Sequence, residues 1–207
     1  MSALLQKHQE ILDKALDACS KRYSWTAYPE SPSSKIWGRE KPVAGKANFE
    51  AMLGTDYHLA QPGEVGRTGL EISPYTGEPL GISYPKMDVD LLYQAIESGM
   101  PSWRNATPQT RIGVCLEILD RCAGQLFENA HATMHTSGQS YIMAFAGSGA
   151  NALDRGLEAL AYAHKAMSDV PETAKWERQF GKSGSARLHK TYRIMPRGVG
   201  VVVCCAT

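Results

Sequence analysis

The chain has 207 residues, which is enough for one medium-sized domain or for part of a larger protein. Hydrophobic residues make up 43% and charged residues 21%, with a formal net charge of +1, as in an ordinary globular protein. Basic residues are scattered among acidic ones, which excludes a cationic surface built for nucleic acid or for an acidic membrane. The sequence has no apolar run approaching the roughly 18 residues of a membrane span.

The N-terminal residues and the cysteines favour the cytoplasm. Residues 2–19 carry charges among their apolar residues, so they lack the apolar core of a signal peptide. The five cysteines are odd in number and widely spread, unlike the disulfide framework of a secreted protein. We therefore expect reduced thiols in the cytoplasm.

The first third of the chain predicts a helix, an irregular arm and a short second helix. Apolar residues recur every three or four positions over 4–19, which predicts one helix of about five turns. Prolines, glycines and serines break regular structure over 23–42, but the aromatic residues of this stretch indicate an arm that lies over a neighbouring surface. A short helix over 45–53 would stop at Gly54.

The middle of the chain is predicted to be mostly helical. Two short extended pieces flank a turn at Thr76 and Gly77. Asp88 then caps a helix that Pro101 would end, and Thr107 caps another. Residues 130–135 either continue that helix or form a short successor, which ends at Gly138. A last helix over about 151–167 precedes a polar span, 172–185, that we expect to be an exposed connection.

The end of the chain predicts a buried strand. From Gly198 onward no residue is charged, and Val201 to Val203 are continuous β-branched residues, as in a strand covered on both faces of a parallel sheet. One interpretation is the first strand of a truncated βαβ domain, because such a strand needs neighbours that the sequence does not supply. The other is an edge strand that pairs with residues 188–195 in a hairpin.

Several segments together resemble the aldehyde dehydrogenase superfamily. Ser-Pro-Tyr-Thr-Gly-Glu-Pro-Leu-Gly at 73–81 is similar to the family's Asn-Pro-Ala-Thr-Gly-Glu opening, and Pro-Arg-Gly-Val-Gly-Val-Val at 196–202 to its first strand. Each motif alone is weak, but their order and spacing are specific. The other matching segments are 88–90, 102–103, 107–111 and 135–139.

The resemblance implies an α/β fold of which this chain is the N-terminal, mostly helical portion, ending in the first strand of a Rossmann-like sheet. It also implies four parts: a helical extension with an irregular arm at 1–71, the helical part of the nucleotide-binding domain at 72–187, an oligomerisation strand at 188–197 and the truncated strand at 198–207. The full-length protein would then be a homo-oligomer. The first 70 residues resemble a branch of the family that acts in bacterial phenylacetate breakdown.

The chemistry that the resemblance implies lies mostly beyond this chain. In the family a cysteine thiolate attacks the aldehyde, an asparagine and a backbone N–H hold the oxyanion, hydride passes to NAD or NADP, and a glutamate activates water. The nucleophile and base lie far downstream, so no catalytic residue is assigned and the 207-residue chain alone is expected to be inactive. Cys205, Ala206 and Thr207, at the mouth of the strand, are the candidate cofactor-binding residues, with plain strand-end packing as the alternative. No asparagine stands there.

Other constellations favour structural roles. His131 and His135 have the spacing of two zinc ligands on a helix, but no third ligand is evident, and we assign no metal site. Cys115 and Cys122 share an apolar stripe, which favours core packing. Gly-Ser-Gly at 147–149 follows no strand and is expected to be a helix junction. Tyr141, Met143 and Phe145 are expected in the core rather than along a substrate tunnel.

Two hypotheses follow. The first is part of an NAD(P)-dependent enzyme that oxidises a small aldehyde of phenylacetate or aromatic catabolism, without nucleic-acid or membrane partners. The second is a non-enzymatic helical interaction module or subunit of a larger assembly.

Overall fold

The computed structural model describes residues 2–202. Its strands are β1 (Glu64–Thr68), β2 (Tyr84–Met87), β3 (Thr173–Gln179) and β4 (Ser185–Thr191). Its helices are α1 (Ala3–Lys7), α2 (Gln9–Lys21), α3 (Ser34–Trp37), α4 (Glu40–Met52), α5 (Val89–Asn105), α6 (Pro108–Gly124), α7 (Leu126–Ser137), α8 (Tyr141–Phe145) and α9 (Ala152–Ser168), with a π-helical turn, η1 (Ala146–Asn151), between the last two. None of the described helices is long and apolar enough to cross a bilayer.

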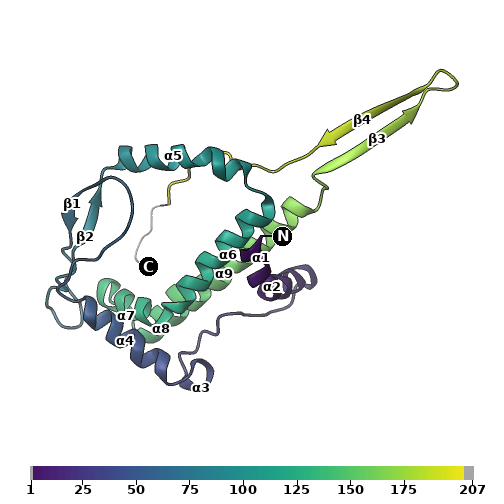
Figure 1. Cartoon of the computed structure of the whole chain (residues 1–207). Helices are drawn as coiled ribbons and strands as arrows, with labels where there is room; N and C mark the ends of the chain where they lie inside the picture. The colour runs from purple at the N-terminus through teal and green to yellow at the C-terminus, as the bar shows by residue number, and fades with distance from the viewer. Residues whose placement is uncertain (1, 203–207) are drawn as a thin grey trace.

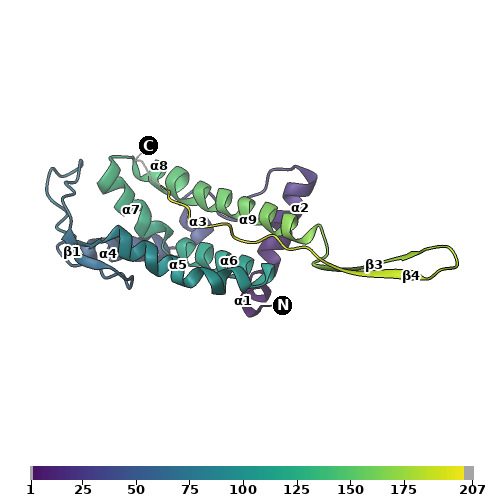
Figure 2. The same cartoon turned by 90° about the horizontal axis from the view of Figure 1, so that it is seen from above.

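The main core lies between α6 and α9 and the helices packed against them (Figures 1 and 2). The predicted apolar stripes meet there: Ile112 and Leu116 of α6 and Leu157 of α9 are almost fully buried. Leu126 and Phe145 close the core from α7 and α8. Burial of a side chain of this size stabilises the fold by about 1.5–3 kcal/mol, so this cluster supplies most of the packing.

The N-terminal segment forms two helices where the sequence predicts one. The helix breaks at His8, because α1 packs against α6 whereas α2 packs against α9. Gly113 permits the first contact, since a Cβ there would lie only 2.7 Å from the Leu5 backbone nitrogen. Leu5 and Leu12 on either side of the break are both buried, so the bend serves two separate packing surfaces.

The irregular arm lies over the helical core as predicted. Asp154, buried on α9, accepts hydrogen bonds from the Thr26 hydroxyl and, at 3.0 Å, from the Ala27 backbone N–H. Further along, Trp37 packs edge-on against Phe127 and Phe145. The arm ends earlier than expected, because α4 begins at Glu40 and accommodates Pro42 in its first turn, where a missing N–H costs nothing.

Two predicted capping residues, Asp88 and Thr107, begin helices as expected, and Ser140 is a further cap that the sequence did not predict. The side chains of Asp88, Thr107 and Ser140 each accept a backbone N–H of the following first turn. Gly138 ends α7 with a left-handed φ of 77°. The prediction that Pro101 ends α5 is wrong: the helix continues to Asn105. The exposed proline lacks one backbone N–H, and the helix continues past it to its last turn, which the C-cap Ala106 N–H closes by donating to Ser102 O at 3.0 Å.

Short extended segments surround Ser73–Gly81. The turn at Thr76 and Gly77 is present, with Gly77 at a φ of 73° and an isolated bridge between Ile72 and Pro79. The sequence did not predict β1 and β2, which pair antiparallel beside it.

The most extended feature is the antiparallel hairpin β3–β4, which projects away from the helices (Figure 1). The span 172–185 is exposed as predicted, but it is not an irregular connection, since most of it is the first strand of the hairpin and its loop. The strand expected within 188–197 is present as β4 but runs over Ser185–Thr191. β4 pairs with β3. The alternative, in which this strand pairs with the segment that begins at Gly198, is therefore wrong for the described residues 198–202.

Candidate functional site

The predicted cofactor residues Cys205, Ala206 and Thr207 lie outside the described residues and stay a prediction. The segment that leads to them is described from Gly198 to Val202 and forms no strand there, contrary to expectation. Val201 and Val202 are each 85% exposed. A strand needs a partner for its backbone groups, and no described segment lies beside these residues in a ladder.

The glycine-containing turn at 147–149 is a helix junction, as predicted. It lies in η1 and follows helix α8 rather than a strand, and Gly149 is packed against Leu126. A dinucleotide loop needs free backbone N–H groups between a strand and a helix. The turn at 147–149 is therefore not a cradle for the phosphates of NAD.

The histidines of α7 are packed rather than poised to bind a metal. Phe49 of α4 stacks on both rings, with centroids 6.2 Å from His131 and 5.0 Å from His135. His135 Nδ1 also lies 2.7 Å from the hydroxyl of buried Ser73. Burial first, and then the charge of Lys46, lowers the pKa of His131, which favours its neutral form. The pair helps to fix the 73–81 loop on α7.

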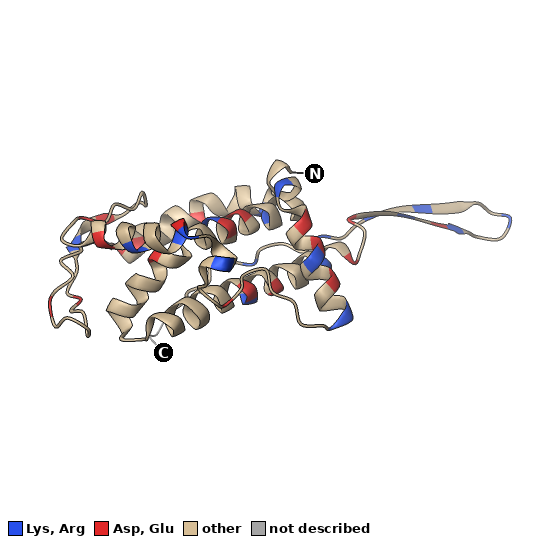
Figure 3. Cartoon of the chain, turned by 90° about the horizontal axis from the view of Figure 1, so that it is seen from below, with Lys and Arg blue, Asp and Glu red and all other residues tan. Residues whose placement is uncertain are grey.

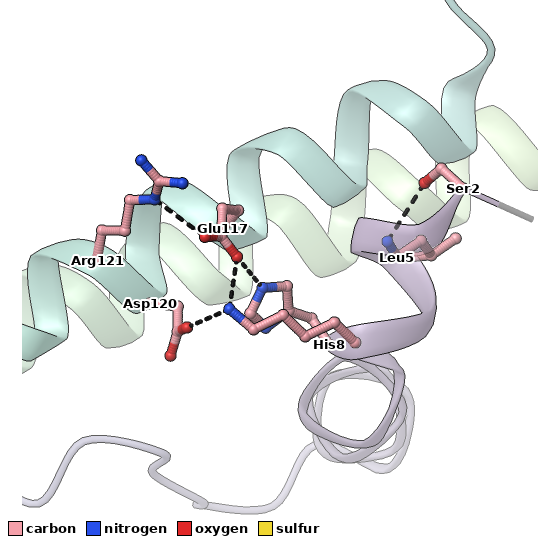
Figure 4. A network of polar contacts seen from close by, with 7 residues as sticks. Ser2, Leu5, His8, Glu117, Asp120 and Arg121 are labelled. Atoms are coloured by element: carbon pink, nitrogen blue, oxygen red, sulfur yellow. Dashed lines mark hydrogen bonds and ion pairs between the residues drawn. The ribbon is translucent and has the colours of Figure 1, made fainter.

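A polar cluster joins α1 to α6 (Figure 4). Glu117 Oε2 lies 2.7 Å from Lys7 Nζ and 2.8 Å from His8 Nε2, and Asp120 lies 3.0 Å from the same lysine. His8, Glu117 and Asp120 are close enough together to hold a metal ion. The ammonium group of Lys7, however, occupies the position between the carboxylates, so the cluster is satisfied as an ion-pair network that fixes α1.

The hydrogen bonds of this network lower the pKa of Glu117 to about 2, with the bond from Lys7 as the largest cause.

Charges elsewhere are mixed. Figure 3 shows blue and red residues interspersed along the helices, in keeping with the balanced composition.

The cysteines differ in their surroundings. Cys115 is partly buried, and burial raises the pKa of its thiol, which disfavours a reactive thiolate. Cys122 is exposed, so the prediction that it packs in the core is wrong, and the residue faces outward from α6. The expectation of core packing in α8 is confirmed for Phe145, which is fully buried, but is wrong for Met143, which is 59% exposed.

Two uncovered surfaces stand out among the described residues. Helix α5 begins after Asp88 as its sequence predicts, yet none of its residues is buried, and Val89 and Ile96 of its apolar stripe are exposed. The hairpin β3–β4 is similarly exposed along both strands. Because opposed residues of an antiparallel pair point to the same side, Trp176 and Leu188 share one face. The sequence reasoning missed this face, although Trp176 in a polar stretch was a signal.

Comparison with solved structures identifies the fold. The chain is similar to the NAD-dependent aldehyde dehydrogenase from Burkholderia multivorans, with 41% sequence identity and a TM-score of 0.93 over 99% of this chain and 37% of that one. It is also similar to the Delta-pyrroline-5-carboxylate dehydrogenase from Mycobacterium tuberculosis bound with NAD and cobalamin, with 17% identity and a TM-score of 0.54 over 75% of this chain and 30% of that one. No family model and no curated protein matches the chain.

The chain therefore has an aldehyde dehydrogenase-type fold over part of that fold's length. The identity of 41% supports the superfamily predicted from the motifs, while the more distant likeness supports the fold alone. The chain spans 37% of the length of the Burkholderia multivorans enzyme.

Proposed function

We propose that the chain is the N-terminal part of an NAD(P)-dependent enzyme that oxidises an aldehyde. The observation that carries this proposal is the likeness, at 41% identity over 99% of the chain, to an NAD-dependent aldehyde dehydrogenase. When bound, the nicotinamide supplies the acceptor for the hydride of the oxidised aldehyde. The described residues would serve as scaffold, and the nucleophile, the base and most nucleotide contacts would come from the rest of the full-length protein.

The proposed substrate is an aldehyde of phenylacetate breakdown. Four segments, at 1–8, 28–30, 61–63 and 134–139, resemble phenylacetic acid degradation protein N. In the structure the first of these forms α1 and the last includes His135 at the end of α7. The proposal includes a cytoplasmic location, where exposed thiols such as Cys122 stay reduced.

Two exposed surfaces support a larger, oligomeric protein. Helix α5 is amphipathic, and its apolar stripe is exposed although globular proteins normally bury such a stripe. We propose that the nucleotide-binding sheet of the full-length enzyme packs against it. A two-stranded hairpin is marginal alone in water, and the face with Trp176 and Leu188 is suited to pairing with a second copy of the protein. The full-length protein is thus proposed to be a homo-oligomer.

The test begins with the reading frame downstream of Thr207. The full-length protein is purified, and aldehyde-dependent formation of NADH and NADPH is followed with phenylacetate-related and aliphatic aldehydes. We expect activity that is lost when the downstream cysteine nucleophile is replaced by serine, and no activity for the 207-residue chain alone.

The result also separates the two hypotheses. A full-length protein without a downstream cysteine and glutamate, and without aldehyde-dependent reduction of either nucleotide, would sink the enzymatic proposal and favour an interaction module. Activity with aliphatic aldehydes alone would keep the enzyme and reject the phenylacetate role.

A further inference from the structure

One buried arginine contacts every segment that meets at the base of the β3–β4 hairpin. Arg111, in the first turns of α6, donates from Nη1 to Ala106 O at 2.9 Å. Its Nη2 lies 3.3 Å from the sulfur of Met167, in the last turn of α9, where the chain enters the hairpin. The same nitrogen donates to Ile194 O at 2.7 Å, where the chain leaves it. Arg111 thereby connects both roots of the hairpin to the α5–α6 corner.

A second arginine, which lies in the segment after β4, donates hydrogen bonds back to the C-terminal end of α5. Arg193, the second residue after β4, donates from Nη2 to Asn105 O at 3.0 Å and to Ala106 O at 3.1 Å. Ala106 O therefore accepts from both guanidinium groups. These carbonyls end α5, where the helix dipole favours positive charge. Figure 1 shows the chain after β4 running back past this end of α5.

Burial of the Arg111 charge costs free energy of folding, which indicates that its hydrogen bonds have a structural role. It is only 5% exposed, and among the described residues it has no carboxylate partner. Burial and the neighbouring charge of Arg193 both lower the pKa of its guanidinium. An uncompensated buried charge is tolerated only where its hydrogen bonds are well made. The guanidinium of arginine carries its donors on separate nitrogens of a rigid planar fork, and Arg111 uses both Nη1 and Nη2, whereas the three donors of a lysine ammonium all radiate from one nitrogen.

We propose that Arg111 is a positioning residue that fixes the direction in which the hairpin leaves the helical body, with Arg193 as the second tie. The hairpin strands are bonded to each other, so their orientation depends on their two roots. A hairpin held in one direction presents the Trp176–Leu188 face in the orientation that a second subunit would bind, so the entropic cost of ordering the hairpin is not added to association. This consequence rests on the proposed oligomeric function, but the positioning itself does not.

The test compares Arg111→Lys and Arg111→Met with the wild type in the full-length protein. Methionine keeps the apolar stem without donors, and lysine keeps the charge without the fork. Arg121→Lys is the matched control, because Arg121 lies on the same helix, is exposed and pairs only at the surface with Glu117. The first readout is hydrogen exchange at the amide of Tyr192, which donates to Glu172 O at 2.8 Å across the hairpin root, compared with amides of α9. The second is the subunit dissociation constant from sedimentation.

We expect Arg111→Met to accelerate exchange at the root by at least about tenfold while the α9 amides keep their rates. It should also raise the subunit dissociation constant by at least about tenfold, with Arg111→Lys in between and Arg121→Lys unchanged. If Arg111→Met does not fold, Arg193→Gln removes the second tie from a more exposed side chain and should show the same pattern, more weakly.

Three results are decisive. Root exchange that rises no more than in Arg121→Lys overturns the positioning role. Faster root exchange with unchanged association overturns its link to the subunit interface. A wild-type protein that stays monomeric at every concentration refutes the oligomeric function, and the exchange measurement then decides the positioning role by itself.

Discussion

Substitution of Gly45 by alanine tests the tightest helix contact of the fold. Gly45 lies inside α4, which packs against α7. A Cβ there would lie 2.8 Å from the Glu128 backbone nitrogen and 2.9 Å from the Phe127 carbonyl carbon, so α4 would have to move. Overpacking of this kind costs about 1–3 kcal/mol, against a gain of up to about 1 kcal/mol from better helix propensity. We expect net destabilisation of about 1–2 kcal/mol.

The control is Gly99→Ala in α5, where an added Cβ would meet nothing within 4 Å. It should stabilise the protein by about 0.5–1 kcal/mol, since only the propensity term acts. Urea unfolding followed by far-ultraviolet circular dichroism, at low protein concentration, measures both variants. The melting temperature should fall for Gly45→Ala by about 2–4 °C for each kcal/mol lost. A Gly45→Ala variant as stable as Gly99→Ala would refute the close packing of α4 on α7.

Three further predictions follow from single contacts. Asp154→Ala should cost about 1–2 kcal/mol, because it removes the acceptor of two part-buried hydrogen bonds, from the Thr26 hydroxyl and the Ala27 backbone N–H; unchanged urea unfolding would contradict the anchoring of the arm. Glu117 contributes stability above its ordinary pKa of 4.5 that is lost as the pH falls toward about 2. Glu117→Gln should therefore flatten the acid limb of the unfolding free energy, and an unaltered limb would count against the network. Trp176→Ala should raise the subunit dissociation constant of the full-length protein by at least about tenfold, with Lys182→Ala in the hairpin loop as the control; equal dissociation constants would reject this face as the interface.

The helices were predictable because their signals are local. Asp88, Thr107 and Gly138 act on the turn next to them, and the structure has the expected cap at each position. The stripe through Ile112 and Leu116 likewise determines which face of α6 is buried. The break at His8 was not predictable in this way, because it depends on α1 and α2 meeting different partners.

The strands were harder because their residues carry no clear alternation. β1 reads Glu-Val-Gly-Arg-Thr, and β3 reads Thr-Ala-Lys-Trp-Glu-Arg-Gln, both mostly polar. Such strands form because a partner elsewhere in the chain supplies hydrogen bonds, not because of a buried face. The opposite error occurred after Gly198, where an apolar sequence predicted a strand that residues 198–202 do not form.

The role of Arg111 was also hidden from sequence reasoning. The motif at 107–111 placed this arginine in a helix start, but two of its three acceptors, at 167 and 194, come from segments far along the chain. A buried charge with only neutral acceptors is visible only once those segments are assembled.

Helix α5 and the hairpin β3–β4 both expose apolar side chains on the surface of this fold. The regular backbone hydrogen bonds of each element lie within it, along the helix in α5 and between the two strands in the hairpin. Neither has its apolar side chains covered by the described residues: Val89 is 75% exposed and Leu188 is 51% exposed. Local propensity thus sets their conformation, whereas their burial must come from elsewhere. The arginines Arg111 and Arg193 join the end of α5 to the roots of the hairpin, so the two uncovered surfaces are held in one geometry. If the proposed function holds, this connection sets the α5 surface and the hairpin face in one fixed orientation for the two partners proposed for them.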